Sequence, residues 1–338
     1  MSQALADSIE PATAEAAPGT APRAWPHRHL LDTDVLTWPQ IELVMDTAAA
    51  MAEIVERRRP RSEALRGVGV TNLFYEASTR TRVSFEVAAK HLSADVVNVT
   101  AGGSSVEKGE SLLDTMRTLE ALGARVLVIR HALSGAPYLV AREFGGSVIN
   151  AGDGRHAHPT QALLDLYTLR RHLPGGSLQG RKVVILGDVL HSRVARSNLW
   201  TLTAAGADVW ICGPATLLRG FEAWAAAGVG GTRRFTVTTD IAAALRDADA
   251  VMALRVQQER MAAGLLPSLH EYAARFGLTA ERLVRAAEGC LVLHPGPMNE
   301  GVEIAPDVAR GSRSLVTEQV RNGVPIRMAV LSLVTSVT

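Results

Sequence analysis

Short apolar runs alternate with longer amphipathic stretches over most of the chain. A first series of runs is typical of buried strands, at residues 68–74, 95–99, 126–130 and 147–149. After a helical pattern from Gln161 to Leu173, a second series follows at residues 182–186, 208–211, 250–254 and 291–293. Strands separated by amphipathic helices indicate parallel sheets that helices cover. The pattern therefore predicts an α/β fold with two similar domains, each a parallel sheet flanked by helices.

The two ends of the chain depart from this alternation. Residues 1–27 are dominated by Ala, Pro, Ser and acidic side chains, with almost no large apolar groups to pack, so we expect a disordered tail. A helical pattern of apolar residues then runs from Ile41 to Ile54. Near the C-terminus, residues 318–334 predict a last amphipathic helix after a turn at Gly323, Val324 and Pro325.

The composition of the chain argues against several classes of partner and site. The 338 residues carry a net charge of only +1, so no overall field favours nucleic acid or an anionic membrane, and an anionic ligand must be held by local groups. Cys212 and Cys290 stand outside any C-x-x-C or zinc-ligand spacing, and we expect reduced core residues. No apolar run approaches the roughly 18 residues that cross a bilayer, and the first residues lack a secretory signal. We therefore expect a soluble cytoplasmic protein.

The segment F-Y-E-A-S-T-R-T-R-V-S-F-E, at residues 74–86, follows an apolar strand and opens a helical pattern. Ser78 or Thr79 would cap that helix and leave free backbone N–H groups at its start. These groups, together with the Thr81 hydroxyl and the Arg80 guanidinium, suit a phosphate dianion. The alternative is an ordinary helix cap beside two solvated arginines.

Other polar side chains stand where predicted strands end. Arg130 and His131 close one strand, and ligands of open α/β sheets bind at the carboxyl ends of strands. Arg193 follows a strand of the second series, and Arg255 and Gln257 follow another. Two arginines suit a dicarboxylic amino acid, because each guanidinium can hold a carboxylate with two parallel hydrogen bonds.

Nucleotide and metal sites are not expected. I-L-G-D at residues 185–188 ends a strand as in nucleotide-binding folds, but neither G-x-G-x-x-G nor G-x-x-x-x-G-K-[ST] occurs in the chain. H-A-H at residues 156–158 suggests a metal, yet no third ligand stands at a convincing spacing. We expect neither a metal nor another cofactor, and a nucleotide-binding or oxidoreductase domain pair stays an alternative on the fold alone.

The order and spacing of these segments resemble the aspartate and ornithine carbamoyltransferase family. F-Y-E-A-S-T-R-T-R is similar to the carbamoyl-phosphate signature of that family, and the resemblance covers essentially the whole chain after the tail. The other matching segments are S-S-V-E-K-G-E-S-L-L-D-T at 104–115, V-I-R-H at 128–131, H-P-T-Q-A-L-L-D-L-Y-T at 158–168, G-D-V-L-H-S-R-V-A-R-S-N at 187–198, L-R-V-Q-Q-E-R at 254–260 and H-P-G-P-M-N-E-G-V-E-I at 294–304. The activity this implies is transfer of a carbamoyl group from carbamoyl phosphate to an amino acid.

The resemblance also implies a role for each matching residue. Carbamoyl phosphate would be bound by Ser78, Thr79, Arg80, Thr81, Ser104, Lys108, Arg130, His158 and Gln161. Of these, the catalytic residues would be Arg80, Thr81, Lys108, Arg130 and His158. The amino acid would be held by Lys108, Arg193, Arg255 and Gln257 and by the backbone of Pro295 and Gly296.

The H-P-G-P turn at residues 294–297 bears on the choice of amino acid. Ornithine enzymes typically have H-C-L-P here, and Cys290 does not stand at the matching place. With Arg255 and Gln257, the turn favours aspartate and a role in de novo pyrimidine biosynthesis. An ornithine or other amino-acid carbamoyltransferase and a non-catalytic scaffold subunit are the alternatives. No side-chain base for the amine proton is evident, so we hypothesise that the leaving phosphate accepts it.

The resemblance extends to assembly. In the family, the residues matching Ser104 and Lys108 reach the active site of a neighbouring subunit, which implies a homotrimer with shared sites. The last helix there packs back on the first domain. This implies a carbamoyl-phosphate-binding domain of residues 28–160 plus 320–338 and an aspartate-binding domain of residues 161–319. The sequence leaves open whether trimers pair with regulatory subunits or with a dihydroorotase.

Overall fold

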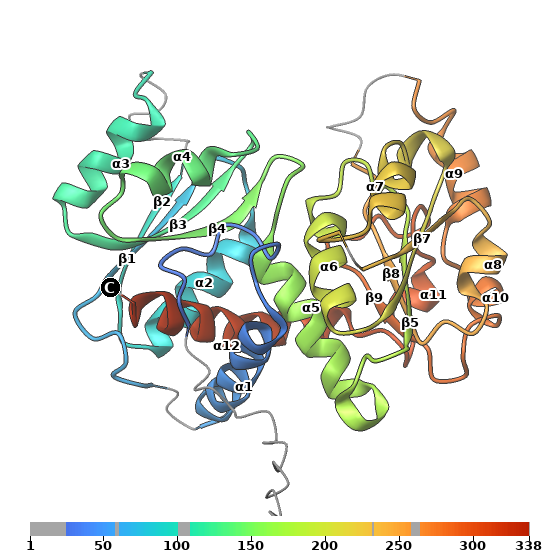
Figure 1. Ribbon diagram of the computed structural model, residues 1–338, viewed down its shortest axis with the longest axis horizontal. Helices are drawn as coiled ribbons and strands as arrows, with labels where there is room; N and C mark the ends of the chain where they lie inside the picture. The colour runs from blue at the N-terminus through green and yellow to red at the C-terminus, as the bar shows by residue number, and fades with distance from the viewer. Residues whose placement is uncertain (1–24, 58–60, 101–108, 232, 258–263, 338) are drawn as a thin grey trace, which may run out of the picture.

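The computed structural model describes residues 25–57, 61–100, 109–231, 233–257 and 264–337 (Figure 1). Two parallel sheets occupy the two halves of the molecule, and helices flank each of them. Helix α5 (Pro159–His172) lies between the halves, and helix α12 (Val316–Thr335) runs back from the second half to the first. The α/β fold predicted from the sequence is confirmed, including the return of the last helix to the first domain.

The first sheet joins four parallel strands in the order β2-β1-β3-β4. Its strands are β1 (Gly69–Phe74), β2 (Asp95–Thr100), β3 (Ala124–His131) and β4 (Ser147–Asp153). Along β3, Val126 and Val128 pack towards the helices α1 (Trp38–Val55), α2 (Thr79–His91) and α12. Their neighbours Leu127 and Ile129 face α3 (Leu112–Ala121) and α4 (Ala136–Glu143). Both faces of the sheet are therefore buried along β1, β3 and β4, as is typical of parallel sheets, whereas the edge strand β2 is largely exposed.

The second sheet has the order β7-β6-β5-β8-β9, again with every strand parallel. Its strands are β5 (Lys182–Leu186), β6 (Asp208–Cys212), β7 (Thr236–Thr238), β8 (Ala250–Ala253) and β9 (Leu291–Leu293). The accompanying helices are α6 (Arg193–Ala204), α7 (Phe221–Ala227), α8 (Ile241–Leu245), α9 (Leu269–Phe276), α10 (Ala280–Leu283) and α11 (Pro306–Ala309). The edge strand β7 was not predicted, because three half-buried residues give too short an apolar signal.

The predicted turn at Gly323, Val324 and Pro325 is wrong. Helix α12 continues through all three residues, with Pro325 inside it. Proline removes one helical hydrogen bond, but this helix packs on α1, α2 and α5 and buries most of its second half. Gly323 has a packing role, since a Cβ there would clash with Nη1 of Arg327. Tertiary packing thus overrides the local signal.

Residues 1–24 of the predicted disordered tail lie outside the described residues. Trp25 is only 7% exposed, and Nε2 of His27 lies 3.1 Å from Oε1 of Gln40, so ordered packing begins before residue 28. The predicted limit at residues 160 and 161 falls inside α5, and that at 319 and 320 falls inside α12. Two helices, rather than loops, thus connect the sheets.

The structure also bears on the two cysteines and on membrane-spanning segments. Cys212 and Cys290 are free and buried, as predicted. Within the described ranges, no helix combines the length and the apolar character needed to span a bilayer.

Candidate active site

The start of α2 is built as the sequence predicts. Ser78 caps the helix, and its Oγ accepts a hydrogen bond from the backbone N of Thr81 at 3.4 Å. The first turn contains no acidic side chain, so no carboxylate of the helix itself competes for its free N–H groups and its dipole. Thr79 and Arg80 occupy that first turn. This is a suitable place for a phosphate group.

Arg130 lies next to the end of β3, beside the segment that follows β1. The backbone N of Tyr75 donates to the carbonyl oxygen of Arg130, which fixes the two chain segments side by side. Nη2 of Arg130 donates to Oε1 of Glu76 at 2.6 Å, and Nη1 donates to the carbonyl oxygen of Ala151 at 3.2 Å. The guanidinium is only 11% exposed and therefore has a fixed position.

Glu76 is a cavity residue for which the sequence predicts no role. Its Oε1 accepts from Nη2 of Arg193 at 2.5 Å, and its Oε2 accepts from Nη1 of Arg193 at 3.1 Å. Arg193 is the first residue of α6 in the second half, so Glu76 links the two halves through one bidentate ion pair. An acidic residue beside a phosphate signature was the available signal, because it calls for a cationic partner.

His158 and Gln161 stand at the start of α5. The backbone N of His158 donates to Oγ of Ser197 at 3.0 Å, and Nε2 of Gln161 donates to Oδ1 of Asp165 at 2.9 Å. Burial, followed by the charges of Arg130 and Arg193, lowers the pKa of His158 well below its usual value. The imidazole is therefore neutral at physiological pH, and it can donate a hydrogen bond from one ring nitrogen.

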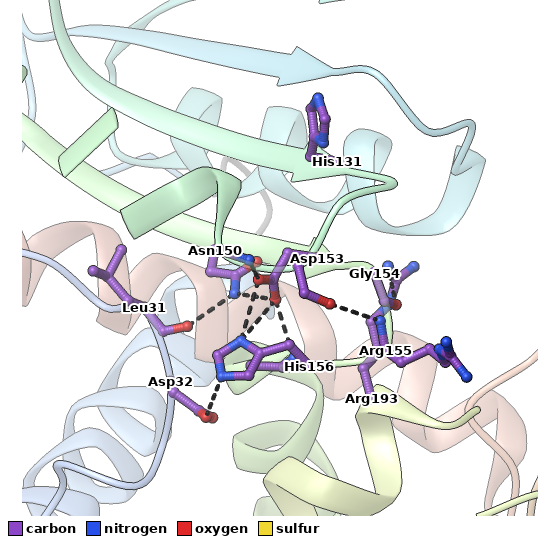
Figure 2. A network of polar contacts seen from close by, with 12 residues as sticks. Leu31, Asp32, His131, Asn150, Asp153, Gly154, Arg155, His156 and Arg193 are labelled. Atoms are coloured by element: carbon purple, nitrogen blue, oxygen red, sulfur yellow. Dashed lines mark hydrogen bonds and ion pairs between the residues drawn. The ribbon is translucent and has the colours of Figure 1, made fainter. Parts of the chain in front are cut away.

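The loop before α5 carries a second polar network, which Figure 2 shows from close by. Its centre is the Asp153 carboxylate, which accepts from Nδ2 of Asn150 at 2.8 Å and lies 3.1 Å from Nδ1 of His156. On the other side of the ring, Nε2 of His156 lies 3.7 Å from the Asp32 carboxylate. Oδ1 of Asp32 in turn accepts from the hydroxyl of Ser197, the residue that holds the His158 backbone.

The second half supplies Arg255 and Gln257 just after β8. The backbone N of Gln257 donates to Oδ2 of Asp188 at 3.1 Å, which ties this segment to the loop after β5. Burial and the nearby charge of Arg255 lower the pKa of Arg80. The two like charges, one from each half, thus approach each other across the cavity. An anion between them would relieve that repulsion.

The H-P-G-P turn closes the same cavity. The backbone N of Gly296 donates to Nδ1 of His294 at 2.8 Å, and Nε2 of that ring lies 3.1 Å from Oε1 of Glu303. Gly296 has a φ of 66°, and a Cβ there would lie 2.8 Å from Cζ of Arg80. Glycine is required at this point because the turn runs against the arginine of the phosphate site.

The side chains of these segments meet at one cavity of about 770 Å³ at the junction of the two halves, which the Asp153–His156 network adjoins without lining. It collects the predicted residues Ser78, Thr79, Arg80, Thr81, Arg130, His158, Gln161, Arg193, Arg255, Gln257, Pro295 and Gly296. The predicted residues Ser104 and Lys108 lie outside the described residues. Among the described lining residues, five arginines face a single glutamate, Glu76. The cavity is thus strongly cationic in a chain of nearly zero net charge, which suits small polyanions.

The side chains of this cavity suit the binding of anions better than that of a metal ion. In the part of the chain that the structure describes, no group of three His, Cys, Asp or Glu side chains is arranged to hold a metal ion. The cavity instead offers hydrogen-bond donors, which suit phosphate and carboxylate oxygens and a developing oxyanion.

Comparison with known protein families indicates which anions this cavity is expected to bind. The model of the "Aspartate/ornithine carbamoyltransferase, carbamoyl-P binding domain" matches residues 28–171, and that of the "Asp/Orn binding domain" of the same family matches residues 179–334. The chain belongs to the aspartate/ornithine carbamoyltransferase family. The first of these carbamoyltransferase domains ends with α5 and the second begins just before β5, so the cavity lies where the two meet.

Curated carbamoyltransferases are similar over nearly the whole chain. The aspartate carbamoyltransferase catalytic subunit of Roseiflexus sp. (strain RS-1) is 59% identical over 90% of this chain and 94% of its own length. That of Chloroflexus aggregans is 56% identical over 90% of this chain and 97% of its own length. Both are named for aspartate as the substrate.

Solved carbamoyltransferase structures share the fold. Ornithine carbamoyltransferase from Pyrococcus furiosus has a TM-score of 0.81 at 27% identity and covers 93% of this chain and 98% of its own. Aspartate transcarbamoylase from Trypanosoma cruzi, in complex with carbamoyl aspartate and phosphate, has a TM-score of 0.80 at 29% identity, with 93% and 97% covered. The fold is therefore common to enzymes of both substrates, and it does not by itself choose between them.

Proposed function

We propose that this chain transfers the carbamoyl group of carbamoyl phosphate to the amine of L-aspartate and releases N-carbamoyl-L-aspartate and phosphate. The observation that carries the proposal is the arrangement of arginines in one cavity. Arg80 and Arg130 stand on the phosphate side, and Arg193 and Arg255 stand on the side of the second sheet. The sequence identity of 49–59% to catalytic subunits named for aspartate supports the same substrate.

In this proposal, carbamoyl phosphate lies at the start of α2. Ser78, Thr79 and Arg80 bind its phosphate, while Arg130, His158 and the Thr81 hydroxyl contact its carbonyl oxygen. Gln161 accepts from the carbamoyl NH2 group. These positions suit an oxyanion, because buried donors that are already oriented need no reorganisation when charge develops. Removing one such donor typically lowers the rate about 10²- to 10³-fold.

Aspartate then binds on the opposite wall of the cavity. Arg193 holds its α-carboxylate, Arg255 and Gln257 hold its side-chain carboxylate, and the backbone of Pro295 and Gly296 orients its amine. The amine nitrogen attacks the carbamoyl carbon, the new C–N bond forms, and the bond from that carbon to the phosphate oxygen breaks. Alignment of two bound substrates can supply up to roughly 7–11 kcal/mol of the acceleration.

The leaving phosphate is the proposed acceptor of the amine proton. Among the described lining residues, the Glu76 carboxylate already accepts from two arginines, which makes it a poor base. The lowered pKa of His158 makes its imidazole a weak base as well. A pH–rate and isotope study that revealed an essential titrating side chain in the aspartate complex would contradict this assignment.

Release of N-carbamoyl-aspartate and phosphate from purified chain tests the function. We expect turnover with L-aspartate, none with L-ornithine, and a loss of turnover in an Arg255→Ala variant. Arg275→Ala is the matched control, because Arg275 is 69% exposed and pairs with Glu271 on its own helix. Turnover with ornithine would change the proposed substrate but keep the carbamoyl-phosphate site. No turnover with either amino acid would favour a scaffold subunit.

We also propose a homotrimer whose active sites are completed by Ser104 and Lys108 of the neighbouring chain. Mixing two inactive variants, Lys108→Ala and Arg255→Ala, tests this directly. If the sites are shared, random assembly of a cyclic trimer restores about a quarter of the wild-type sites. If each chain holds a complete site, mixing restores no activity.

The proposed setting is pyrimidine biosynthesis in the cytoplasm. Two free buried cysteines are in keeping with a reducing compartment. Cell fractionation of the native host would test the location, and co-purification would test association with a dihydroorotase or a regulatory subunit.

A further inference from the structure

Asp165 is a fully buried carboxylate at the place where three helices meet. It lies on α5, four residues after Gln161, and is 0% exposed. Its Oδ1 accepts from Nε2 of Gln161 at 2.9 Å and from Nε2 of Gln319, on α12, at 2.7 Å. Its Oδ2 accepts from Nδ2 of Asn198, on α6, at 2.9 Å. Three side-chain amides thus converge on one carboxylate.

An ionised carboxylate can only accept hydrogen bonds, so each amide must turn its NH2 group inward. The oxygen of each amide then points away from Asp165. For Gln161, which also lines the cavity, the consequence is that the NH2 group is turned towards Asp165 and the oxygen is left to accept from a ligand. A carbamoyl NH2 group is a donor and needs such an acceptor.

The Gln319 amide links Asp165 to the turn that is proposed to orient aspartate. Oε1 of Gln319 accepts from the backbone N of His294 at 2.9 Å. His294 opens the turn that contains Pro295 and Gly296, so the orientation of the Gln319 amide fixes the start of that turn. A flipped Gln319 would present NH2 to the His294 N–H, and two donors would face each other.

The charge state of Asp165 supports this arrangement. Burial raises the pKa of Asp165 to about 6, against the opposing effect of the hydrogen bonds from Asn198, Gln319 and Gln161. The group is therefore mainly ionised at neutral pH and accepts from all three amides.

We propose that Asp165 is a positioning residue for carbamoyl transfer, because its carboxylate locks the Gln161 and Gln319 amides in the orientations that serve the carbamoyl NH2 group and the His294–Gly296 turn. The proposal rests on the proposed function. Asp165 acts through the two glutamines, whereas a purely structural role would require only that the helices stay packed.

The chain offers a matched control one turn further along the same helix pair. Nδ2 of Asn322, on α12, donates to Oγ1 of Thr168, on α5, at 2.9 Å. Thr168 is 0% exposed and Asn322 is 4% exposed, and neither lines the cavity. Thr168→Val removes this buried α5–α12 hydrogen bond without touching the amides around Asp165.

The first experiment compares Asp165→Asn with Thr168→Val. Asparagine has nearly the same shape but offers one acceptor oxygen and one donor nitrogen, so the three amides can no longer all donate. We expect Asp165→Asn to lower kcat/KM for carbamoyl phosphate about 10²-fold, as small misplacements of a reacting group do. Thr168→Val should lower Tm but leave kcat and KM close to wild type.

A double-mutant cycle separates positioning from packing. In a Gln161→Ala background, one of the two amides on which Asp165 acts is gone, so the further effect of Asp165→Asn should shrink to about tenfold or less. Equal effects of Asp165→Asn in both backgrounds would overturn the proposal. So would wild-type kinetics of Asp165→Asn in an otherwise unchanged chain.

Gln319→Leu serves as a second variant if Asp165→Asn does not fold. It keeps the Asp165–Gln161 contact and removes the bond to His294, so we expect KM for aspartate to rise about tenfold. An unchanged KM would refute the role of Gln319. An inactive wild type would refute the proposed function and the inference with it, whereas an active wild type with these variants unaffected would refute the inference alone.

Discussion

The Glu76 carboxylate and the Arg193 guanidinium form a bidentate ion pair, with nitrogen–oxygen distances of 2.5 and 3.1 Å. Glu76 follows β1 in the first half, and Arg193 begins α6 in the second. The same carboxylate accepts from Arg130, so one acidic side chain sets the positions of two arginines from different halves. This pair therefore couples the arrangement of the two halves to the geometry of the cavity.

Glu76→Gln should impair catalysis strongly. A neutral amide cannot balance two arginines that are 11% and 5% exposed, so both guanidinia lose their fixed positions. We expect kcat/KM for aspartate to fall about 30- to 5,000-fold, since breaking a buried, hydrogen-bonded charge pair costs about 2–5 kcal/mol. Steady-state kinetics measure the effect. Glu86→Gln weakens the more exposed pair with Lys90 and alters the acceptor of the Asn98 amide, outside the cavity lining, and should leave kcat/KM unchanged.

Gly152→Ala should disturb the same arginines from the backbone side. Gly152 has a φ of 116°, and a Cβ there would lie 2.9 Å from Cζ of Arg193 and 3.1 Å from Nη1 of Arg130. We expect a loss of about 1–3 kcal/mol in the free energy of unfolding from backbone strain, together with a clear fall in kcat. Urea unfolding and steady-state kinetics would measure the two effects.

Gly180 provides the control for Gly152. It also has a positive φ, of 69°, but a Cβ there would meet no atom within 4 Å. Gly180→Ala should therefore lower stability by about 1–2 kcal/mol without changing kcat. Equal losses of kcat in both variants would show that strain alone, and not contact with the arginines, explains the effect at Gly152.

His158→Ala should lower kcat by about 10²- to 10³-fold, as expected for the loss of one oxyanion donor. The lowered pKa of His158 means that its cationic form is disfavoured in the fold, so the ring is already neutral over the pH range of an assay. The loss should consequently be the same from about pH 6 to pH 9. A pH–rate profile whose acid limb disappears in the variant would contradict a neutral His158.

His156 should make a pH-dependent contribution to stability. Its hydrogen bond to Asp153, opposed by burial and helped by the charges of Asp153, Asp32 and Asp34, raises the pKa of His156. A raised folded-state pKa means that this stabilisation is fully present below the unfolded value and is lost as pH rises through the folded one. His156→Asn should thus lower Tm more at about pH 6.5 than at about pH 9.

Thermal unfolding of wild type and the His156→Asn variant at both pH values measures that difference directly. The comparison cancels groups that titrate identically in the two chains, and the T-shaped contact of the His156 ring with Tyr138 is lost at both pH values. A constant difference in Tm would mean that His156 acts by packing and not by charge.

The helix start around Ser78 could be predicted because its causes are local. A cap hydrogen bond spans three residues, and the free N–H groups follow from the helix itself. The buried strands were found for the same reason, since apolar runs such as Lys182–Leu186 and Leu291–Leu293 are continuous in sequence. Pro325 shows the limit of local rules, because long-range packing carried the helix through it.

The sequence by itself thus determined the alternation of strands and helices, the helix start that suits a phosphate, and the set of arginines predicted for the site. Only the tertiary structure decided which groups meet: Glu76 lies 117 residues from Arg193, and Gln319 lies 154 residues from Asp165. Periodicity and helix capping depend on neighbours along the chain, so the local sequence around each residue encodes them. The partner of a buried charge depends on how distant segments cross, and the burial that makes such a pair matter exists only once the chain has folded.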